Sequence, residues 1–85
     1  MENINWQYEG IAAEGTPFRI DGVNVWESKW IKSNFKNFSV PHPSHPSQYH
    51  EMTSYKIEEN GKSVNIAVSE VSANVYVFYK LARNT

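Results

Sequence analysis

The chain has 85 residues, of which 40% are hydrophobic and 14% aromatic, and eight basic and nine acidic residues leave a formal net charge of −1. Such a composition predicts a folded chain with a single domain over residues 1–85, since disordered chains are poorer in aromatic and β-branched residues. The near-neutral charge disfavours nucleic acid as a partner, and the absence of cysteine excludes disulfides and thiolate chemistry.

The first residues lack the basic segment and the apolar segment that together make a secretory signal peptide. No apolar run approaches the ~18 residues that a membrane-spanning helix needs. We therefore expect a protein that does not enter a membrane and is cytoplasmic, or is exported without a cleavable signal peptide.

The N-terminal segment predicts a first β-strand, because Ile4, Trp6 and Tyr8 alternate with polar residues. From Gly10 to Gly15 the pattern breaks, which indicates irregular or bulged backbone. The sequence leaves open whether this strand closes the sheet into a barrel.

A first hairpin is predicted around Asp21-Gly22, because this dipeptide supplies the positive φ angles of a two-residue type I′ turn. The turn pairs Ile20 with Val23 and places alternate apolar side chains on one face, towards the core. This face consists of Phe18, Ile20, Val23 and Val25. Trp26 falls on the opposite face with Arg19, where either the guanidinium lies over the indole or another element covers it.

Residues 28–38 fit either a short helix or an extended segment. Large apolar side chains recur there at helical spacing, but Glu27 and Asn34 interrupt the apolar arc. The same segment carries Lys29, Lys32 and Lys36. Cations beside aromatic rings suit single-stranded nucleic acid, but three lysines on a near-neutral chain fit a solvated face better. The fold class is therefore mainly β, or α+β with one short helix.

Residues 40–48 form a connector rich in proline and histidine. Its prolines fix φ and remove backbone donors, so the segment cannot be a central strand. Alternating proline favours polyproline II, which would set His42 and His45 on the same side, roughly 9 Å apart. With His50 they form the spacing His-x2-His-x4-His, which is not a zinc signature.

The second half of the chain predicts a three-stranded antiparallel meander. Asn60-Gly61 is a second type I′ dipeptide, and its register places Tyr55 beside Ile66 on an apolar face, with a polar, solvated face behind. Residues 75–81 are apolar at both parities, which predicts a strand covered on both faces, entered through a turn at residues 72–74. The expected architecture is a small antiparallel sheet or a partly open barrel.

Extension of this register places Glu51 opposite Glu70 at the open end of the hairpin. Two carboxylates facing each other repel, and a zinc or other divalent ion would neutralise them. The candidate metal ligands are His42, His45, Glu51 and Glu70. The simpler interpretation is that the strands separate before this point and both glutamates turn to solvent. We favour the second interpretation.

The aromatic content indicates a binding role. Three tryptophans, five tyrosines and four phenylalanines exceed what a core of this size can hide, and Trp and Tyr are enriched at interfaces. The candidate binding residues are Trp26, Trp30, Tyr49 and Tyr76.

We therefore expect a non-enzymatic protein-interaction module, such as an adaptor, an inhibitor or an immunity-type protein. It would contact a protein partner through these aromatics or through an edge strand, which would also permit a homodimer. The alternatives are carbohydrate or other small-ligand binding on an aromatic platform, and the divalent-metal site at the connector. No catalytic residues are predicted, because the sequence has neither a glycine-rich phosphate loop nor a nucleophile elbow.

Overall fold

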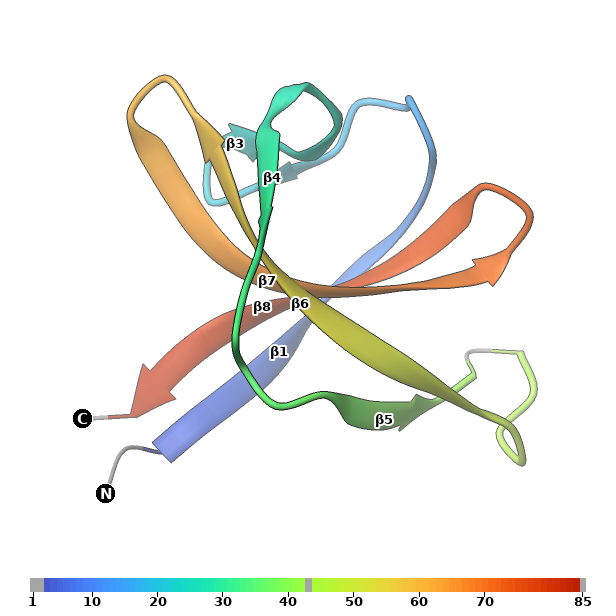
Figure 1. Ribbon diagram of the computed structural model, residues 1–85. Helices are drawn as coiled ribbons and strands as arrows, with labels where there is room; N and C mark the ends of the chain where they lie inside the picture. Colours follow the sequence, from blue (N-terminus) through green and yellow to red (C-terminus); the bar gives the residue numbers. More distant parts are fainter. Residues whose placement is uncertain (1–2, 43, 85) are drawn as a thin grey trace.

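The computed structural model describes residues 3–42 and 44–84 and shows a mostly β chain (Figure 1). In chain order the elements are β1 (Asn3–Ala13), β2 (Arg19–Ile20), β3 (Val23–Asn24), the 3₁₀ turn η1 (Val25–Glu27), β4 (Lys29–Lys32), β5 (Phe38–Pro41), β6 (Tyr49–Glu59), β7 (Lys62–Ser72) and β8 (Val75–Asn84). Residues 28–38 are extended or irregular, so the mainly β alternative is confirmed and the short helix is wrong.

The main sheet is antiparallel and open. Its strand order is β1-β8-β7-β6-β4, and β5 pairs with the first part of β6. The predicted meander corresponds to β6, β7 and β8, and the N-terminal strand joins it next to β8. Because β1 and β4 each stand at an end of this order, the sheet is not closed into a barrel.

Both predicted type I′ turns are confirmed. The φ angles are 52° at Asp21 and 83° at Gly22, and 52° at Asn60 and 81° at Gly61. The pairs that the turns set are also present, with Ile20 opposite Val23 in β2–β3 and Tyr55 opposite Ile66 in β6–β7. The turn dipeptides therefore determined the register of both hairpins.

Strand β1 contains the predicted irregularity but extends past it. The register with β8 shifts between Tyr8 and Gly10, where Gly10 has a φ of 149°. A Cβ atom at Gly10 would lie 3.3 Å from the Phe18 ring, so the absent side chain makes room for that ring. Pairing resumes beyond the bulge and continues to Ala13, which brings the end of β1 alongside the start of β8.

Two hydrophobic clusters lie on opposite faces of the sheet. The first packs the β2–β3 hairpin against residues of β6 to β8, and its buried members are Ala12, Ile20, Val23, Val25, Ile57, Ile66, Val68 and Phe78. The second consists of Val40, Met52, Ala67 and Val77, with Trp6, Phe38, Val71 and Tyr79 packed against it. Val77 and Phe78 are consecutive and belong to different clusters, as expected for a strand covered on both faces.

The prediction of a solvated second face on the β6–β7 hairpin is wrong over part of its length. Ser54 and Ala67 were expected on that face, and both are buried. The cause is β5, whose Phe38 and Val40 cover this side of the sheet together with Trp6. Pairing on β6 thus brought apolar side chains from a distant segment over a face that reads as polar in isolation.

The turn at Gly61 offers a clean test of the conformational requirement. A Cβ added there meets no atom within 4 Å, so Gly61→Ala introduces only the strain of a positive φ. We expect a loss of about 1–2 kcal/mol in the free energy of unfolding, measured by urea denaturation. Ser63→Ala, at an exposed position nearby, should change it by less than about 0.5 kcal/mol. Equal stability of the two variants would contradict the assigned turn.

The second hydrophobic cluster is tested by Met52→Ala. Met52 is fully buried, so its truncation should cost about 2–5 kcal/mol in the free energy of unfolding. Tyr49→Ala, three residues earlier on the same strand, removes a side chain that is 66% exposed and should cost far less. Similar urea midpoints for the two variants would mean that this face of β6 is not covered.

Candidate functional site

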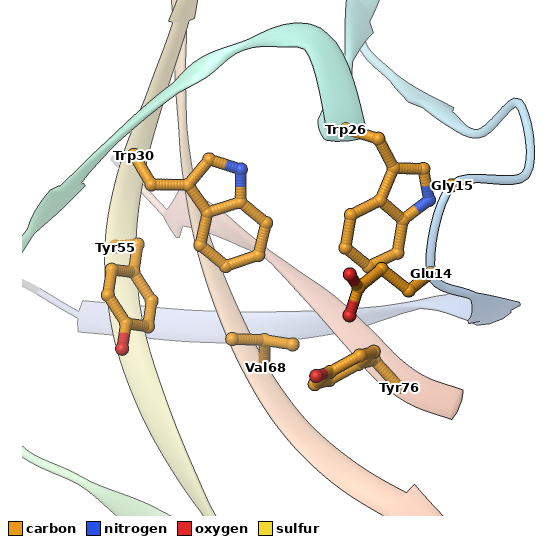
Figure 2. Close-up of a pocket in the computed structure, with 7 residues that line it drawn as sticks. All are labelled: Glu14, Gly15, Trp26, Trp30, Tyr55, Val68 and Tyr76. Carbon is orange, nitrogen blue, oxygen red and sulfur yellow. The ribbon is translucent and has the colours of Figure 1, made fainter. Parts of the chain in front are cut away.

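A pocket of about 520 Å³ opens beside the β2–β3 hairpin (Figure 2). Its side-chain lining consists of Glu14, Trp26, Trp30, Tyr55, Val68 and Tyr76. The four aromatic rings come from η1, β4, β6 and β8, so segments from the whole length of the chain meet here. Pockets of a few hundred Å³ with mostly apolar walls and few polar groups are typical ligand sites.

Trp26 reaches the pocket because the hairpin strand ends at Asn24. The Asn24 side chain caps η1 by accepting a hydrogen bond from the Trp26 backbone N–H over 3.2 Å. The Asn24 backbone N–H donates to Glu59 Oε1 over 2.8 Å, which ties this corner to β6. Because β3 ends at Asn24, the alternation of side chains between the two faces of the strand does not extend to Trp26.

The Trp26 indole therefore does not lie under the Arg19 guanidinium. It packs on other elements instead, with its ring centroid 5.6 Å from that of Phe78 and 5.6 Å from that of Tyr76. The alternative that another element covers Trp26 is confirmed. Its Nε1 atom is buried and has no hydrogen-bond partner among the described residues.

Trp30 is held by a hydrogen bond to the same turn. Its Nε1–H donates to the Val25 carbonyl over 2.8 Å, and β4 pairs the residue with Ile57 of β6. With the N–H engaged on the protein, the indole presents its ring to the pocket. The sequence around η1 thus orients both tryptophans.

The four rings form an arc with the two indoles in the middle. The ring centroids are 5.1 Å apart for Tyr55 and Trp30, 6.1 Å for Trp30 and Trp26, and 5.6 Å for Trp26 and Tyr76. The indole planes differ by only 20°, and each tyrosine is tilted by 58° from the neighbouring indole. Figure 2 shows the two indoles side by side, with Tyr55 next to Trp30, Tyr76 next to Trp26, and Val68 between the two tyrosines. The arrangement is a shallow aromatic dish.

Glu14 brings a negative charge to one end of this dish. Its backbone N–H donates to the Asn74 carbonyl over 2.7 Å, which holds the residue beside the start of β8. Figure 2 shows its carboxylate next to Trp26 and Tyr76. Among the described residues that line the pocket, none is basic.

An adjoining hollow of about 240 Å³ shares part of this lining. It has Tyr55, Val68 and Tyr76 in common with the aromatic pocket and adds Glu51 and Glu70. Burial and the charges of Glu70 and Glu14, in that order, raise the pKa of the Tyr76 phenol above its usual 10.0. The electrostatic environment around Tyr76 is therefore negative.

Three of the four predicted binding residues line the pocket. Trp26, Trp30 and Tyr76 meet there, whereas Tyr49 lies at the far end of β6, opposite Pro41. Sequence reasoning missed Tyr55 and Glu14. Tyr55 carried a signal, because a phenol on the apolar face of a hairpin needs either a polar partner or access to solvent. Glu14 carried none, since only the path of β1 along β8 brings it here.

The predicted metal ligands are divided between two places. His42 and His45 line a hollow with Val71, whereas Glu51 and Glu70 line the hollow beside the aromatic pocket. The last β6–β7 pair is Thr53 with Val68, and the strands separate beyond it. The prediction that Glu51 faces Glu70 across the hairpin is therefore wrong. The alternative prediction, that the strands separate before this point, is confirmed. Within residues 3–42 and 44–84 no group of three or more His, Asp or Glu side chains is placed to hold a metal ion.

Only the first two residues of the connector, Val40 and Pro41, are extended, as the end of β5, and the described residues after them form turns. The His45 backbone N–H donates to the His42 carbonyl over 3.2 Å, and the His42 N–H donates to the Gln48 carbonyl over 2.7 Å. Polyproline II has no internal hydrogen bonds, so the bond between His45 and His42 shows that the predicted polyproline conformation is wrong. The His42 ring centroid lies 4.8 Å from that of His45 and 4.6 Å from that of His50.

Both nitrogens of His42 are engaged within the chain. Nδ1 accepts from the Ser44 N–H over 2.9 Å, and Nε2 lies 3.3 Å from the Val71 carbonyl, to which it donates in this tautomer. The His42 side chain therefore stabilises the conformation of the loop.

Comparison of the chain with models of known protein families, with curated proteins and with solved structures found no significant match. The described residues include no helix long and apolar enough to cross a membrane.

The titration of Tyr76 tests the negative environment. Because folding raises this pKa, the phenol contributes stability that is fully present below pH 10.0 and is lost as the pH rises through the folded-state pKa. In a spectrophotometric titration followed near 295 nm, the Tyr76 transition is the one absent from Tyr76→Phe. Glu70→Gln and Glu14→Gln should each move that transition to lower pH, whereas Glu58→Gln should not. A Tyr76 transition unmoved by either pocket variant would contradict the geometry.

Proposed function

We propose that this protein is a non-enzymatic binding module that takes a side group of its partner into the aromatic pocket. The convergence of four half-buried aromatic rings on one pocket supports this proposal most directly. Aromatic side chains of this kind are the anchors that dominate binding energy when a partner covers them. By contrast, Phe78, which packs against both indoles, is fully buried and belongs to the core.

The incomplete burial of these rings distinguishes a binding surface from surplus core. Trp26, Trp30, Tyr55 and Tyr76 all remain partly accessible although each contacts other aromatic rings. A ligand that fills the dish would remove apolar surface from water at four rings at once. The hydrogen bond of Trp30 to Val25 already orders one of them, which lowers the entropic cost of binding.

The chemistry of the pocket favours binding over catalysis. Among the described residues that line the pocket, the titratable groups are the Glu14 carboxylate and the phenols of Tyr55 and Tyr76. A phenol is protonated at neutral pH, and burial and the nearby carboxylates raise the pKa of Tyr76 further above 10.0, so it is unsuited to act as a base.

Carbohydrate binding is a second candidate, because the two indole planes are nearly parallel. An interplanar angle of 20° gives a continuous flat area against which a sugar ring packs, with Glu14 as a hydrogen-bond acceptor at its side. This candidate uses the same pocket and differs in the ligand.

The edge strand β1 offers a second route to a protein partner or to a homodimer. It is eleven residues long, stands at the end of the sheet order, and exposes 57% of Tyr8 and 42% of Ile11. An exposed strand of this length presents unpaired backbone groups for β-augmentation. The bulge at Gly10 interrupts its regular pairing face and makes this route the weaker one.

A fragment screen by NMR tests the binding role. The ¹⁵N-labelled protein is titrated with a library that contains organic cations, sugars and neutral aromatic compounds. At least one class should shift the indole N–H signals of Trp26 and Trp30, and Tyr55→Ala should weaken that response while Tyr49→Ala leaves it unchanged. A library that moves no indole signal would refute the proposal. If the signals of β1 alone shift as the protein concentration rises, the edge strand is favoured as the contact surface.

A further inference from the structure

We propose that the group bound in the aromatic pocket is a methylated ammonium cation. The inference rests on the binding role proposed above and adds the chemical class of the ligand. It follows from the arrangement of the rings, from the negative charges around them and from the mostly apolar walls of the pocket.

The rings are spaced so that one cation contacts several of them. A cation is attracted to the face of an aromatic ring within about 6 Å of its centroid, and tryptophan is the strongest partner. Because the Trp26 and Trp30 centroids are 6.1 Å apart with nearly parallel planes, a cation above the junction of the indoles lies within this range of both. Tyr55 and Tyr76 flank the indoles, with ring centroids 5.1 Å from that of Trp30 and 5.6 Å from that of Trp26, and add aromatic surface beside this position.

The charges near the dish are negative and lack cationic partners within the described chain. Glu14 lines the dish, and Glu51 and Glu70 line the hollow next to it. Among residues 5–42 and 44–82, whose side chains the structure describes, the ion pairs are Lys56 with Glu58 and Lys80 with Asp21, which include none of these three. Glu70 accepts one hydrogen bond, from the Asn74 backbone N–H. All three glutamates are exposed to solvent, so their charges are hydrated and remain free to attract a cation to the dish.

The pocket walls favour a methylated cation over a bare ammonium. A primary ammonium is strongly hydrated and presents three donors that need acceptors. Here the walls are mostly ring carbons and Val68, and the side-chain acceptors are the Glu14 carboxylate and the hydroxyls of Tyr55 and Tyr76. Methyl groups replace those donors with apolar surface while the charge remains, so burial costs less desolvation and gains contact with the rings.

Anionic ligands are disfavoured for the opposite reason. The Trp30 Nε1–H is already bonded to the Val25 carbonyl. The Trp26 Nε1–H has no partner among the described residues, but it is buried and so is not exposed to an anion in the dish. The negative environment around Tyr76 would repel an anion further.

The methylated ammonium group has two sources with the same chemistry. It is either a free small molecule such as choline or the side chain of a methylated lysine in a peptide. The adjoining hollow, with Glu51 and Glu70, offers room and charge for further basic groups of a peptide.

The experiment compares choline with its uncharged isostere 3,3-dimethyl-1-butanol by isothermal titration calorimetry and by the NMR shifts of the Trp26 and Trp30 indoles. We expect choline to bind about tenfold more tightly, in keeping with the strength of cation–π contacts.

A peptide with trimethyllysine and the same peptide with unmodified lysine form the second pair. Tighter binding of the trimethylated peptide than of choline assigns the group to a protein partner, and equal affinity assigns it to a small molecule; both outcomes support the cation.

Variants separate the charge from the shape of the pocket. Glu14→Gln should lower the affinity for choline about threefold or more while leaving that for the neutral isostere unchanged. Glu58→Gln, whose carboxylate is paired with Lys56 outside this pocket, is the matched control and should leave both unchanged. The unfolding midpoint of each variant shows whether the fold is intact.

Two failures are distinguishable. Equal binding of choline and its isostere at the indoles, or a sugar that binds there when choline does not, overturns the cation and leaves the binding role intact. If choline, its isostere, both peptides and the fragment library all leave the indole signals in place, the cation and the binding role are both refuted.

Discussion

Strand β6 changes its neighbours along its length, and the rest of the architecture depends on this change. Residues 49–52 pair with β5, whereas residues 53–59 pair with β7. Where β7 leaves β6, β5 follows the first part of β6 and covers one face of the sheet with Phe38 and Val40, which creates the second hydrophobic cluster. The same separation leaves Glu51 and Glu70 lining a hollow that adjoins the aromatic pocket rather than facing each other across a ladder.

The aromatic pocket depends on the corner at η1 in a similar way. The Asn24 cap ends the hairpin strand and turns Trp26 towards β8, and the Val25 carbonyl accepts the hydrogen bond that orients Trp30. Two indoles are thereby placed side by side at a position where neither is fully buried. The proposed binding role rests on these partly exposed rings that share one pocket.

Residue types predicted much of the candidate site, whereas the positions of these residues along the sequence predicted little of it. The enrichment of aromatics indicated a binding role and selected Trp26, Trp30 and Tyr76, which the fold brings together. The same reasoning selected Tyr49, which lies elsewhere, because composition identifies anchors without saying where they meet. Glu14 escaped it altogether, since its place beside Tyr76 results from the pairing of β1 with β8 across most of the chain.

By itself the sequence determined the local geometry: the two type I′ turns at Asp21-Gly22 and Asn60-Gly61, the registers that follow from them and the bulge near Gly10. These features arise from the φ preferences of one or two residues and from side-chain alternation, which act over a few positions. Only the tertiary structure decided that the polar face of the meander is partly covered, that most of the proline-rich connector forms turns, and that four rings share one pocket. These outcomes depend on long-range packing, in which apolar surface is buried wherever the completed sheet allows.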